Sequence, residues 1–221
     1  MWIMKKRTLP GRNGVYQGCK RIFDFAVSLI ALILLLPVML LIALLIRLQD
    51  GGPAIYRQTR VGRDGRPMQI CKFRSMQMGA DSMFGQLSEK QLTQYRQEFK
   101  IDADPRVTRL GAFLRRTSLD ELPQLWNILK GEMSLVGPRP VVREEMDAFY
   151  AAHEQPLLCS VLPGLTGYWQ ACSSAEDSYV TGRRQRMELE YARNASFGLD
   201  MKLLCITIGT VIRKAYTNRG N

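Results

Sequence analysis

The longest apolar run of the chain covers residues 25–46, contains no charged side chain, and has Pro37 near its middle. A run of about 22 residues is long enough for a helix to cross the ~30 Å hydrocarbon core of a bilayer. Proline removes a backbone donor and clashes with the preceding turn, so the pattern predicts a helix, a break and a second helix over residues 19–48. A spanning helix that tolerates the proline is the alternative.

The flanks of this run bear on its topology, because Lys and Arg favour the cytoplasmic side of a membrane. Basic residues stand on both sides of it: Lys5, Lys6, Arg7, Arg12, Lys20 and Arg21 before, and Arg47, Arg57, Arg60, Arg63 and Arg66 after. A simple span places one cluster on the disfavoured side, whereas a re-entrant hairpin keeps both in the cytoplasm. A cleaved signal peptide is disfavoured, since no small-residue cleavage site follows, and a buried core helix is the least favoured alternative.

After the run, two β-prone stretches at residues 55–62 and 68–74 surround Asp64-Gly65, which predicts a β-hairpin. Farther on, Leu122, Leu125 and Leu129 recur at helical spacing and Gly131 supplies a stop. Further helices are predicted at residues 89–100, 111–116, 143–150, 183–193 and 199–212. The last is apolar but, at about 14 residues, too short to span a bilayer, which indicates an interfacial or core-packing helix. The fold class is therefore α+β, mostly helical, with a small β-hairpin and interfacial amphipathic helices.

The net charge of the chain limits the classes of partner that the protein is expected to bind. The 31 Lys and Arg residues outnumber 20 Asp and Glu, a formal net charge of +11. This balance indicates an anionic partner, and nucleic acid is disfavoured because the membrane segment already accounts for much of the basic flank. The single histidine, His153, lies in a polar stretch, so chemistry based on a histidine base is disfavoured, and the acids, bases and nucleophiles are expected among Asp, Glu, Lys and Cys. Three parts are predicted: a basic segment 1–18, the membrane helix 19–48 and a membrane-associated catalytic domain 49–221.

Two segments carry the candidate chemistry. Asp120 and Glu121 are placed at the beginning of the helix that contains Leu125, but Ser118 and Glu121 also fit a purely structural S-x-x-E capping box. The second segment is a predicted rigid loop at residues 134–140, in which prolines on both sides hold Arg139 in an extended backbone. A guanidinium held in this way suits a phosphate, which it can grip through two parallel hydrogen bonds.

The motifs together resemble the bacterial sugar transferase family, the small monotopic phosphoglycosyl transferases. They occur in the family's order from about residue 20 to the C-terminus: KFRSM at 72–76, DPRVT at 104–108, SLDELPQLWN at 118–127, GEMSLVGPRP at 131–140 and PGLTG at 163–167. Two stretches depart from the family pattern. Leu36 stands where a serine usually precedes the proline, and residues 172–175 replace a Ser-Gly-Arg-Asn-like run.

The resemblance implies transfer of a sugar 1-phosphate from a UDP-sugar to a polyprenyl (undecaprenyl) phosphate, with release of UMP, at the start of exopolysaccharide or glycoconjugate assembly. It implies Asp120 as the nucleophile of a covalent phosphosugar intermediate, Glu121 as its helper, and Mg²⁺ held by both. Lys72, Arg74, Arg139 and Pro140 are the expected substrate-binding residues, and Pro37 the break in a re-entrant helix. The expected location is the inner membrane, with the catalytic domain facing the cytoplasm.

Two rival functions remain at this point. A membrane-anchored glycosyltransferase would move only the sugar and release UDP. A non-enzymatic basic membrane adaptor would not need Asp120 and Glu121. The sequence names neither the sugar nor the polymer, and it leaves open whether the protein forms a homodimer.

Overall fold

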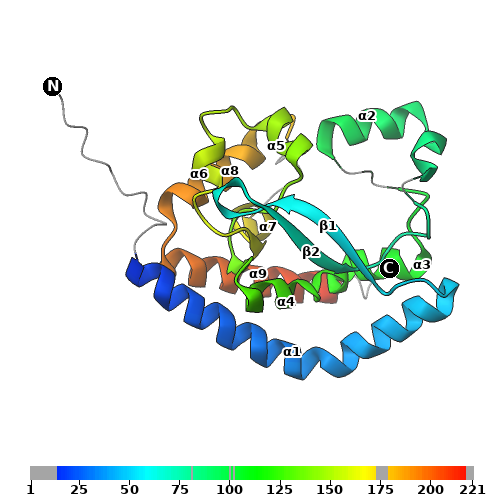
Figure 1. Cartoon of the computed structure of the whole chain (residues 1–221), viewed down its shortest axis with the longest axis horizontal. Coiled ribbons are helices and arrows are strands. Elements are labelled where there is room, and N and C mark those ends of the chain that lie inside the picture. Colours follow the sequence, from blue (N-terminus) through cyan, green and yellow to red (C-terminus); the bar gives the residue numbers. More distant parts are fainter. Residues whose placement is uncertain (1–13, 81, 100, 102, 173–178, 218–221) are drawn as a thin grey trace.

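The computed structural model describes residues 14–80, 82–99, 101, 103–172 and 179–217, with side chains described up to residue 210 (Figure 1). Most of the predicted basic segment 1–18 and of the departure at 172–175 lies outside these residues. The helices are α1 (Gly14–Asp50), α2 (Glu89–Glu98), α3 (Arg109–Thr117), α4 (Gln124–Lys130), α5 (Arg143–Phe149), α6 (Gln155–Leu158), α7 (Tyr168–Cys172), α8 (Arg183–Asn194) and α9 (Phe197–Thr217), and the strands are β1 (Ile55–Val61), β2 (Pro67–Phe73), β3 (Ser134–Val136) and β4 (Gly164–Thr166).

The apolar run belongs to α1, which has 37 residues and includes Pro37. The predicted break into two helices is wrong, because the helix continues through the proline. Its axis is bowed instead, with both ends turned toward the rest of the molecule (Figure 1), and proline is a common cause of such bending. Within the described ranges, α1 is the one helix long and apolar enough to cross a membrane. Its path relative to a membrane stays a prediction.

The predicted hairpin is confirmed: β1 and β2 pair antiparallel in a register that places Tyr56 opposite Lys72. The outer edge of β2 is covered by a side chain rather than by a third strand. The Cys71 N–H donates to Asn127 Oδ1 at 3.0 Å, and Asn127 Nδ2 donates to the Gln69 carbonyl at 2.6 Å. Asn127 belongs to α4 and is fully buried. It therefore fixes α4 against the hairpin.

Sequence reasoning missed a second, parallel pair formed by β3 and β4. Glycines allow the two backbones to approach closely here, since a Cβ built on Gly164 would stand 2.1 Å from the Gly137 nitrogen. The Gly164 N–H donates to the Pro138 carbonyl at 2.8 Å, and the Gly137 N–H donates to the Thr166 carbonyl at 2.9 Å. The predicted rigid loop 134–140 is thus partly a strand, and β4 holds its base.

Both halves of α1 are packed into the rest of the fold. Phe23, Val27 and Leu32 of its first half contact the main core, which α4, β3, α8 and α9 also form. Ile42 and Ile46 of its second half are buried with Phe73 and Leu114. Its other side exposes a continuous apolar surface that includes Leu29, Ile30, Ile33, Leu34, Val38, Leu40, Leu41, Leu44 and Leu45.

The last helix also differs from its prediction. α9 has 21 residues rather than about 14, because it begins at Phe197 and continues to Thr217. Its charged residue Asp200 is 2% exposed. Hydropathy alone could not predict this burial, because burying an isolated carboxylate costs free energy. Asp200 is instead satisfied by partners from α1 and α8, which connect the first turns of α1 to the first turn of α9.

Candidate functional site

The turn that carries Asp120 and Glu121 joins α3 to α4. Ser118 ends α3 in the left-handed region, at φ 57° and ψ 17°, and a 3-10 turn, Leu119–Glu121, follows. The predicted capping box is wrong, because the Ser118 side chain makes no capping hydrogen bond to this turn. Asp120 and Glu121 are therefore one short turn ahead of α4, which begins at Gln124.

Glu121 lies between two cations that come from separate elements. Lys72 of β2 places its Nζ 2.7 Å from Glu121 Oε1, and Arg139 places Nη1 3.9 Å from the same oxygen. The side chain of Glu121 is 22% exposed, whereas Asp120 is buried at 8%. The structure thus brings together the two predicted carboxylates and two of the predicted phosphate-binding cations.

The two carboxylates have opposite electrostatic surroundings. Burial raises the pKa of Asp120 above its ordinary value, while Lys72 opposes the rise and Glu121 adds to it. Burial alone would also raise the pKa of Glu121, but the charges of Lys72 and Arg139 outweigh burial and hold that pKa below its ordinary value. Adjacent groups whose pKa values are pushed apart are typical of sites where the two carboxylates have different roles.

The Arg139 loop is held through its backbone as well as by its prolines. The Arg139 N–H donates to Glu188 Oε2 at 3.1 Å, and burial raises the pKa of Glu188 to about 7. The Arg139 guanidinium carbon lies 6.0 Å from the centre of the Trp169 ring. The same ring lies 4.3 Å from the guanidinium carbon of Arg184. The guanidinium of Arg139 therefore lies between an aromatic face and Glu121.

Arg74 is not gathered with this cluster. Its Nη1 donates to Asp50 Oδ2 at 2.7 Å, its Nη2 contacts Asp50 Oδ1, and the side chain is 9% exposed. Asp50 is the last residue of α1. In this structure Arg74 therefore connects the end of α1 to the end of β2.

Arg60 joins the cluster and was missed as a site residue by sequence reasoning. Its Nη1 donates to the Pro140 carbonyl at 3.2 Å and lies 3.4 Å from Glu145 Oε2. The hairpin register offered a signal, because Arg60 and Lys72 fall on one face of the two paired strands. A small cavity is lined by Arg60, Lys72, Glu121 and Arg139, together with Ile70, Gln124, Pro140, Gly164, Leu165 and Gln170.

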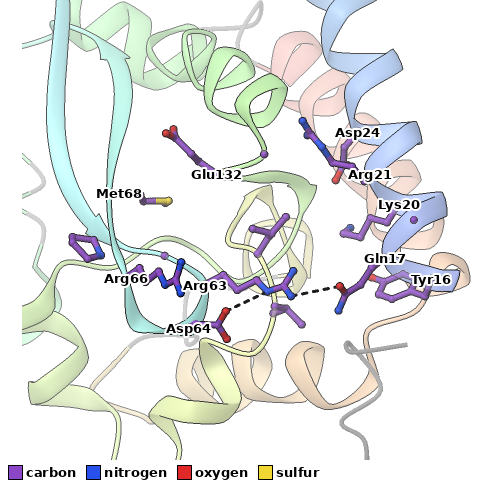
Figure 2. Close-up of a pocket in the computed structure, with 16 residues that line it drawn as sticks. Tyr16, Gln17, Lys20, Arg21, Asp24, Arg63, Asp64, Arg66, Met68 and Glu132 are labelled. Atoms are coloured by element: carbon purple, nitrogen blue, oxygen red, sulfur yellow. Dashed lines mark hydrogen bonds and ion pairs between the residues drawn. The ribbon is translucent and has the colours of Figure 1, made fainter. Parts of the chain in front are cut away.

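A larger cavity of about 620 Å³ lies elsewhere, between the first turns of α1 and the hairpin turn (Figure 2). It shares no lining residue with the small cavity. Charges of both signs line it, among them Lys20, Arg21, Asp24 and Glu132, and most of these are already paired inside the fold. Size alone therefore does not locate the chemistry, and the small cavity, with its converging charges, is the candidate active site.

Asp120 and Glu121 are neighbouring carboxylates of the type that magnesium sites use, and Glu121 Oε1 is paired with Lys72 at 2.7 Å. Mg²⁺ is typically bound by one or two carboxylates, with phosphate and water oxygens completing the octahedron. Among the residues that the structure describes, no group of three or more His, Cys, Asp or Glu side chains forms a complete protein cage. Two neighbouring carboxylates without a third suit an ion that shares its remaining ligands with a substrate phosphate.

Comparison with known proteins identifies the family of this arrangement. The family model described as bacterial sugar transferase matches residues 15–214. The chain is 40% identical over 198 residues to the UDP-galactose-lipid carrier transferase of Erwinia amylovora, covering 88% of this chain and 40% of that protein. It is also 40% identical over 210 residues to the UDP-glucose:undecaprenyl-phosphate glucose-1-phosphate transferase of Escherichia coli. That match covers 92% of this chain and 43% of the relative.

These two relatives are more than twice as long as the matched region, so the chain spans about two fifths of their length. A shorter relative is the exopolysaccharide production protein ExoY of Rhizobium meliloti, which is 40% identical over 195 residues, covering 87% of this chain and 84% of that protein. The matched region includes Lys72, Asp120, Glu121 and Arg139. On the extent of the family match and the identity to these relatives, the chain belongs to the bacterial sugar transferase family.

Proposed function

We propose that this protein transfers a sugar 1-phosphate from a UDP-sugar to a polyprenyl phosphate and releases UMP. The observation that carries the proposal is the buried Asp120 beside Glu121, on which Lys72 and Arg139 converge. Three relatives support the reaction class by name, as a UDP-galactose-lipid carrier transferase, an undecaprenyl-phosphate galactose phosphotransferase and a glucose-1-phosphate transferase. Their names make UDP-galactose and UDP-glucose the first donors to test.

In the first step, a carboxylate oxygen of Asp120 forms a bond to the phosphorus that carries the sugar. The bond from that phosphorus to the bridging oxygen breaks, and UMP leaves with the electron pair. A carboxylate needs no deprotonation at neutral pH, and covalent catalysis divides one difficult displacement between two anions into two. Asp120 then carries the phosphosugar as an acyl phosphate.

In the second step, a phosphate oxygen of the polyprenyl phosphate attacks the same phosphorus. The bond to the Asp120 oxygen breaks, the carboxylate is restored, and a polyprenyl diphosphate sugar is released. Because Lys72 and Arg139 hold the pKa of Glu121 below its ordinary value, Glu121 stays ionised and is suited to holding a cation rather than to accepting a proton. Mg²⁺, held by Asp120 and Glu121 with substrate phosphates, would neutralise charge on the transferring group.

Arg139, Lys72 and Arg60 supply the fixed positive charge that two phosphate substrates require. Lys72 and Arg139 face Glu121, and Arg60 lies beside the Pro140 carbonyl of the Arg139 loop. Cations aimed at a phosphoryl group from a preorganised site stabilise its transition state more than mobile solvent does. Arg74 contributes indirectly, through the connection between α1 and β2.

We further propose that α1 is re-entrant and that both of its ends lie on the cytoplasmic side of the inner membrane. Two contacts support this placement. Near the beginning of α1, Lys20 Nζ lies 2.7 Å from Asp200 Oδ2, and at its end Asp50 pairs with Arg74. A spanning helix separates its ends by the ~30 Å thickness of the hydrocarbon core, whereas these ends are bound to one body. The exposed apolar side of the bowed helix would then lie in the acyl region of the cytoplasmic leaflet.

The deciding experiment incubates the full chain in lipid nanodiscs with polyprenyl phosphate, Mg²⁺ and a panel of UDP-sugars. Release of UMP together with a lipid-linked sugar diphosphate is expected. Release of UDP would instead show a glycosyltransferase. Absence of any nucleotide product across the panel would leave the adaptor as the better account, and binding to anionic vesicles would then depend on the hairpin arginines and not on Asp120.

A further inference from the structure

A carboxylate on the membrane helix reaches the strand that leads to Arg139. Asp24 lies on α1 just before the apolar run and is 2% exposed. Its Oδ1 accepts a hydrogen bond from the Leu135 N–H at 3.1 Å. Leu135 is the middle residue of β3, and Arg139 follows four residues later. The membrane helix thus contacts the backbone of the segment that presents a phosphate-binding cation.

A second connection runs from α1 to the same strand through Asp200. Asp200 accepts hydrogen bonds from Tyr16 OH at 2.8 Å and from Lys20 Nζ at 2.7 Å. Tyr191 OH lies 2.6 Å from Asp200 Oδ1 and 2.9 Å from the Val136 carbonyl. Figure 2 shows Tyr16, Lys20 and Asp24 on successive turns of α1. β3 is therefore linked to the first turns of α1 directly by Asp24 and indirectly by Asp200.

A displacement of β3 would also displace Arg139, because the segment between them is short. Only Gly137 and Pro138 separate Val136 from Arg139, and proline fixes its own φ. The Gly137 N–H is bound to the Thr166 carbonyl, and the Arg139 N–H is bound to Glu188. A short segment fixed at each end behaves as one unit, so the position of β3 determines the position of the guanidinium over Glu121.

We propose that Asp24 is a positioning residue: through its hydrogen bond to β3, the membrane helix sets the position of Arg139 in the active site. The inference rests on the proposed function, in which Arg139 binds phosphate. The competing account gives Asp24 a stabilising role only, because it satisfies a buried N–H that would otherwise lack a partner. The two accounts differ in whether loss of Asp24 acts through Arg139 or through the folded fraction.

Two variants and one control separate these accounts in the full chain reconstituted in nanodiscs. Asp24→Asn retains the oxygen that accepts from Leu135, whereas Asp24→Leu has a similar size and no acceptor. Ser28→Ala is the matched control, because Ser28 is fully buried four residues farther along α1 and its Oγ has no hydrogen-bond partner in the described structure. All variants are compared after normalisation to the folded fraction.

Activity is read as kcat/KM for the UDP-sugar, together with the separate kcat and KM values. Asp24→Leu is expected to lower kcat/KM by about tenfold to a hundredfold, since small displacements of positioning groups have effects of this size. Asp24→Asn and Ser28→Ala should have kcat/KM values within about threefold of the parent protein. Asp24→Asn retains the acceptor oxygen, and the Ser28 hydroxyl has no hydrogen bond to lose. In an Arg139→Ala background, Asp24→Leu should add almost nothing, because the two changes remove the same interaction. An equal loss in both backgrounds would overturn the proposal.

A readout independent of catalysis is amide hydrogen exchange, which reports local opening. Asp24→Leu should increase exchange in residues 134–140 and leave α4 and the hairpin unchanged, and Ser28→Ala should change neither. Unchanged exchange in 134–140, or an equal increase everywhere, would overturn the positioning role. If the parent protein turns over no UDP-sugar, the proposed function fails, and the exchange pattern alone then decides whether Asp24 controls the Arg139 loop.

Discussion

At the scale of single residues, Asp120 and Glu121 show how neighbours in sequence acquire different chemistry. The turn buries Asp120 and leaves Glu121 open to two cations. Burial raises the pKa of Asp120, and Lys72 with Arg139 lowers that of Glu121. The pair therefore divides between a desolvated carboxylate, suited to attack, and a permanently ionised one.

Asp120→Asn should abolish both sugar-phosphate transfer and the covalent phosphosugar adduct. The amide has nearly the same shape, so the fold should be retained, but it is a far weaker nucleophile than a carboxylate. Radiolabelled UDP-sugar followed by denaturing electrophoresis detects the adduct, and UMP release measures turnover. Covalent label on the Asp120→Asn variant, or normal turnover by it, would refute the nucleophile assignment.

The pH dependence of kcat/KM should reflect the raised pKa of Asp120. The ionised form attacks, so activity falls as pH decreases through this pKa, and the acidic limb should lie above the 3.8 of an ordinary Asp. Lys72 lowers the pKa of Asp120, so Lys72→Gln should move the acidic limb to higher pH while also reducing the rate. Because kcat/KM reports the free enzyme, a pH series at low UDP-sugar concentration makes the measurement. A limb that stays in place after Lys72→Gln would contradict the electrostatic coupling.

At the scale of elements, the site depends on side chains and glycines that replace regular sheet contacts. Asn127 takes the place of a third strand beside β2, and Gly137 and Gly164 allow β3 and β4 to touch. The hairpin positions Lys72 and Arg60, and the parallel pair positions Arg139. Each of these small sheets would lose its alignment if its glycine or amide contact were lost.

Asn127→Leu should destabilise the protein and loosen the hairpin. It preserves size but removes the hydrogen-bond partner of the part-buried Cys71 N–H and Gln69 carbonyl, at a cost on the order of 1–3 kcal/mol. Thermal unfolding in detergent measures the loss. Asn194→Ala is the control, because Asn194 lies exposed on α8 and bonds to its own helix at the Glu190 carbonyl. Equal melting temperatures for the two variants would contradict the role of Asn127.

Gly164→Ala should impair catalysis by displacing the Arg139 loop. The new Cβ would meet the Gly137 backbone at 2.1 Å, so one of the strands must move. Gly198→Ala, in α9, is the control because its Cβ would have no atom within 4 Å. We expect at least about a tenfold loss of kcat/KM for the first, as for other displaced positioning groups, and no loss for the second. Comparable activity of both variants would show that the strands adapt without cost to the site.

Sequence reasoning found the elements with strong local signals and missed those formed by tertiary contacts. The two β-prone stretches around Asp64-Gly65 predicted the hairpin, and the spacing of Leu122, Leu125 and Leu129 predicted the helix. The pattern at Ser118 and Glu121 fitted a capping box equally well, but Ser118 adopts a left-handed conformation at the end of α3 and makes no such cap. β3 and β4 have three residues each, too few for periodicity to detect. The role of Arg60 required the register of the hairpin.

At the scale of the whole molecule, α1 is both the candidate membrane helix and a part of the core. It contributes buried residues near both of its ends, including Asp24 and Ile46. Removing it would expose the surfaces of α4 and α9 that it covers, so the remainder cannot be treated as an independent soluble enzyme. The division at residue 49 stays a prediction about where the membrane segment ends.

Both termini should be found on the cytoplasmic side of the inner membrane. The physical reason is that both ends of α1 are tied to one body, by Lys20 with Asp200 and by Asp50 with Arg74. Tags at the N- and C-terminus, tested with a membrane-impermeant reagent in intact and in permeabilised cells, make the measurement. Labelling of the N-terminal tag in intact cells would show a spanning helix, and a periplasmic marker protein confirms that the reagent reaches that compartment.

The contact between Tyr16 and Asp200 can form only late in the synthesis of the chain. These residues are 184 positions apart, and at 5–20 residues per second the ribosome needs on the order of 10–40 s to synthesise the intervening chain. The first turns of α1 are therefore synthesised well before the carboxylate of α9 that they bind. Throughout that interval Lys20 lacks its partner Asp200, so in the proposed membrane placement the bilayer would have to hold α1 until α9 is synthesised.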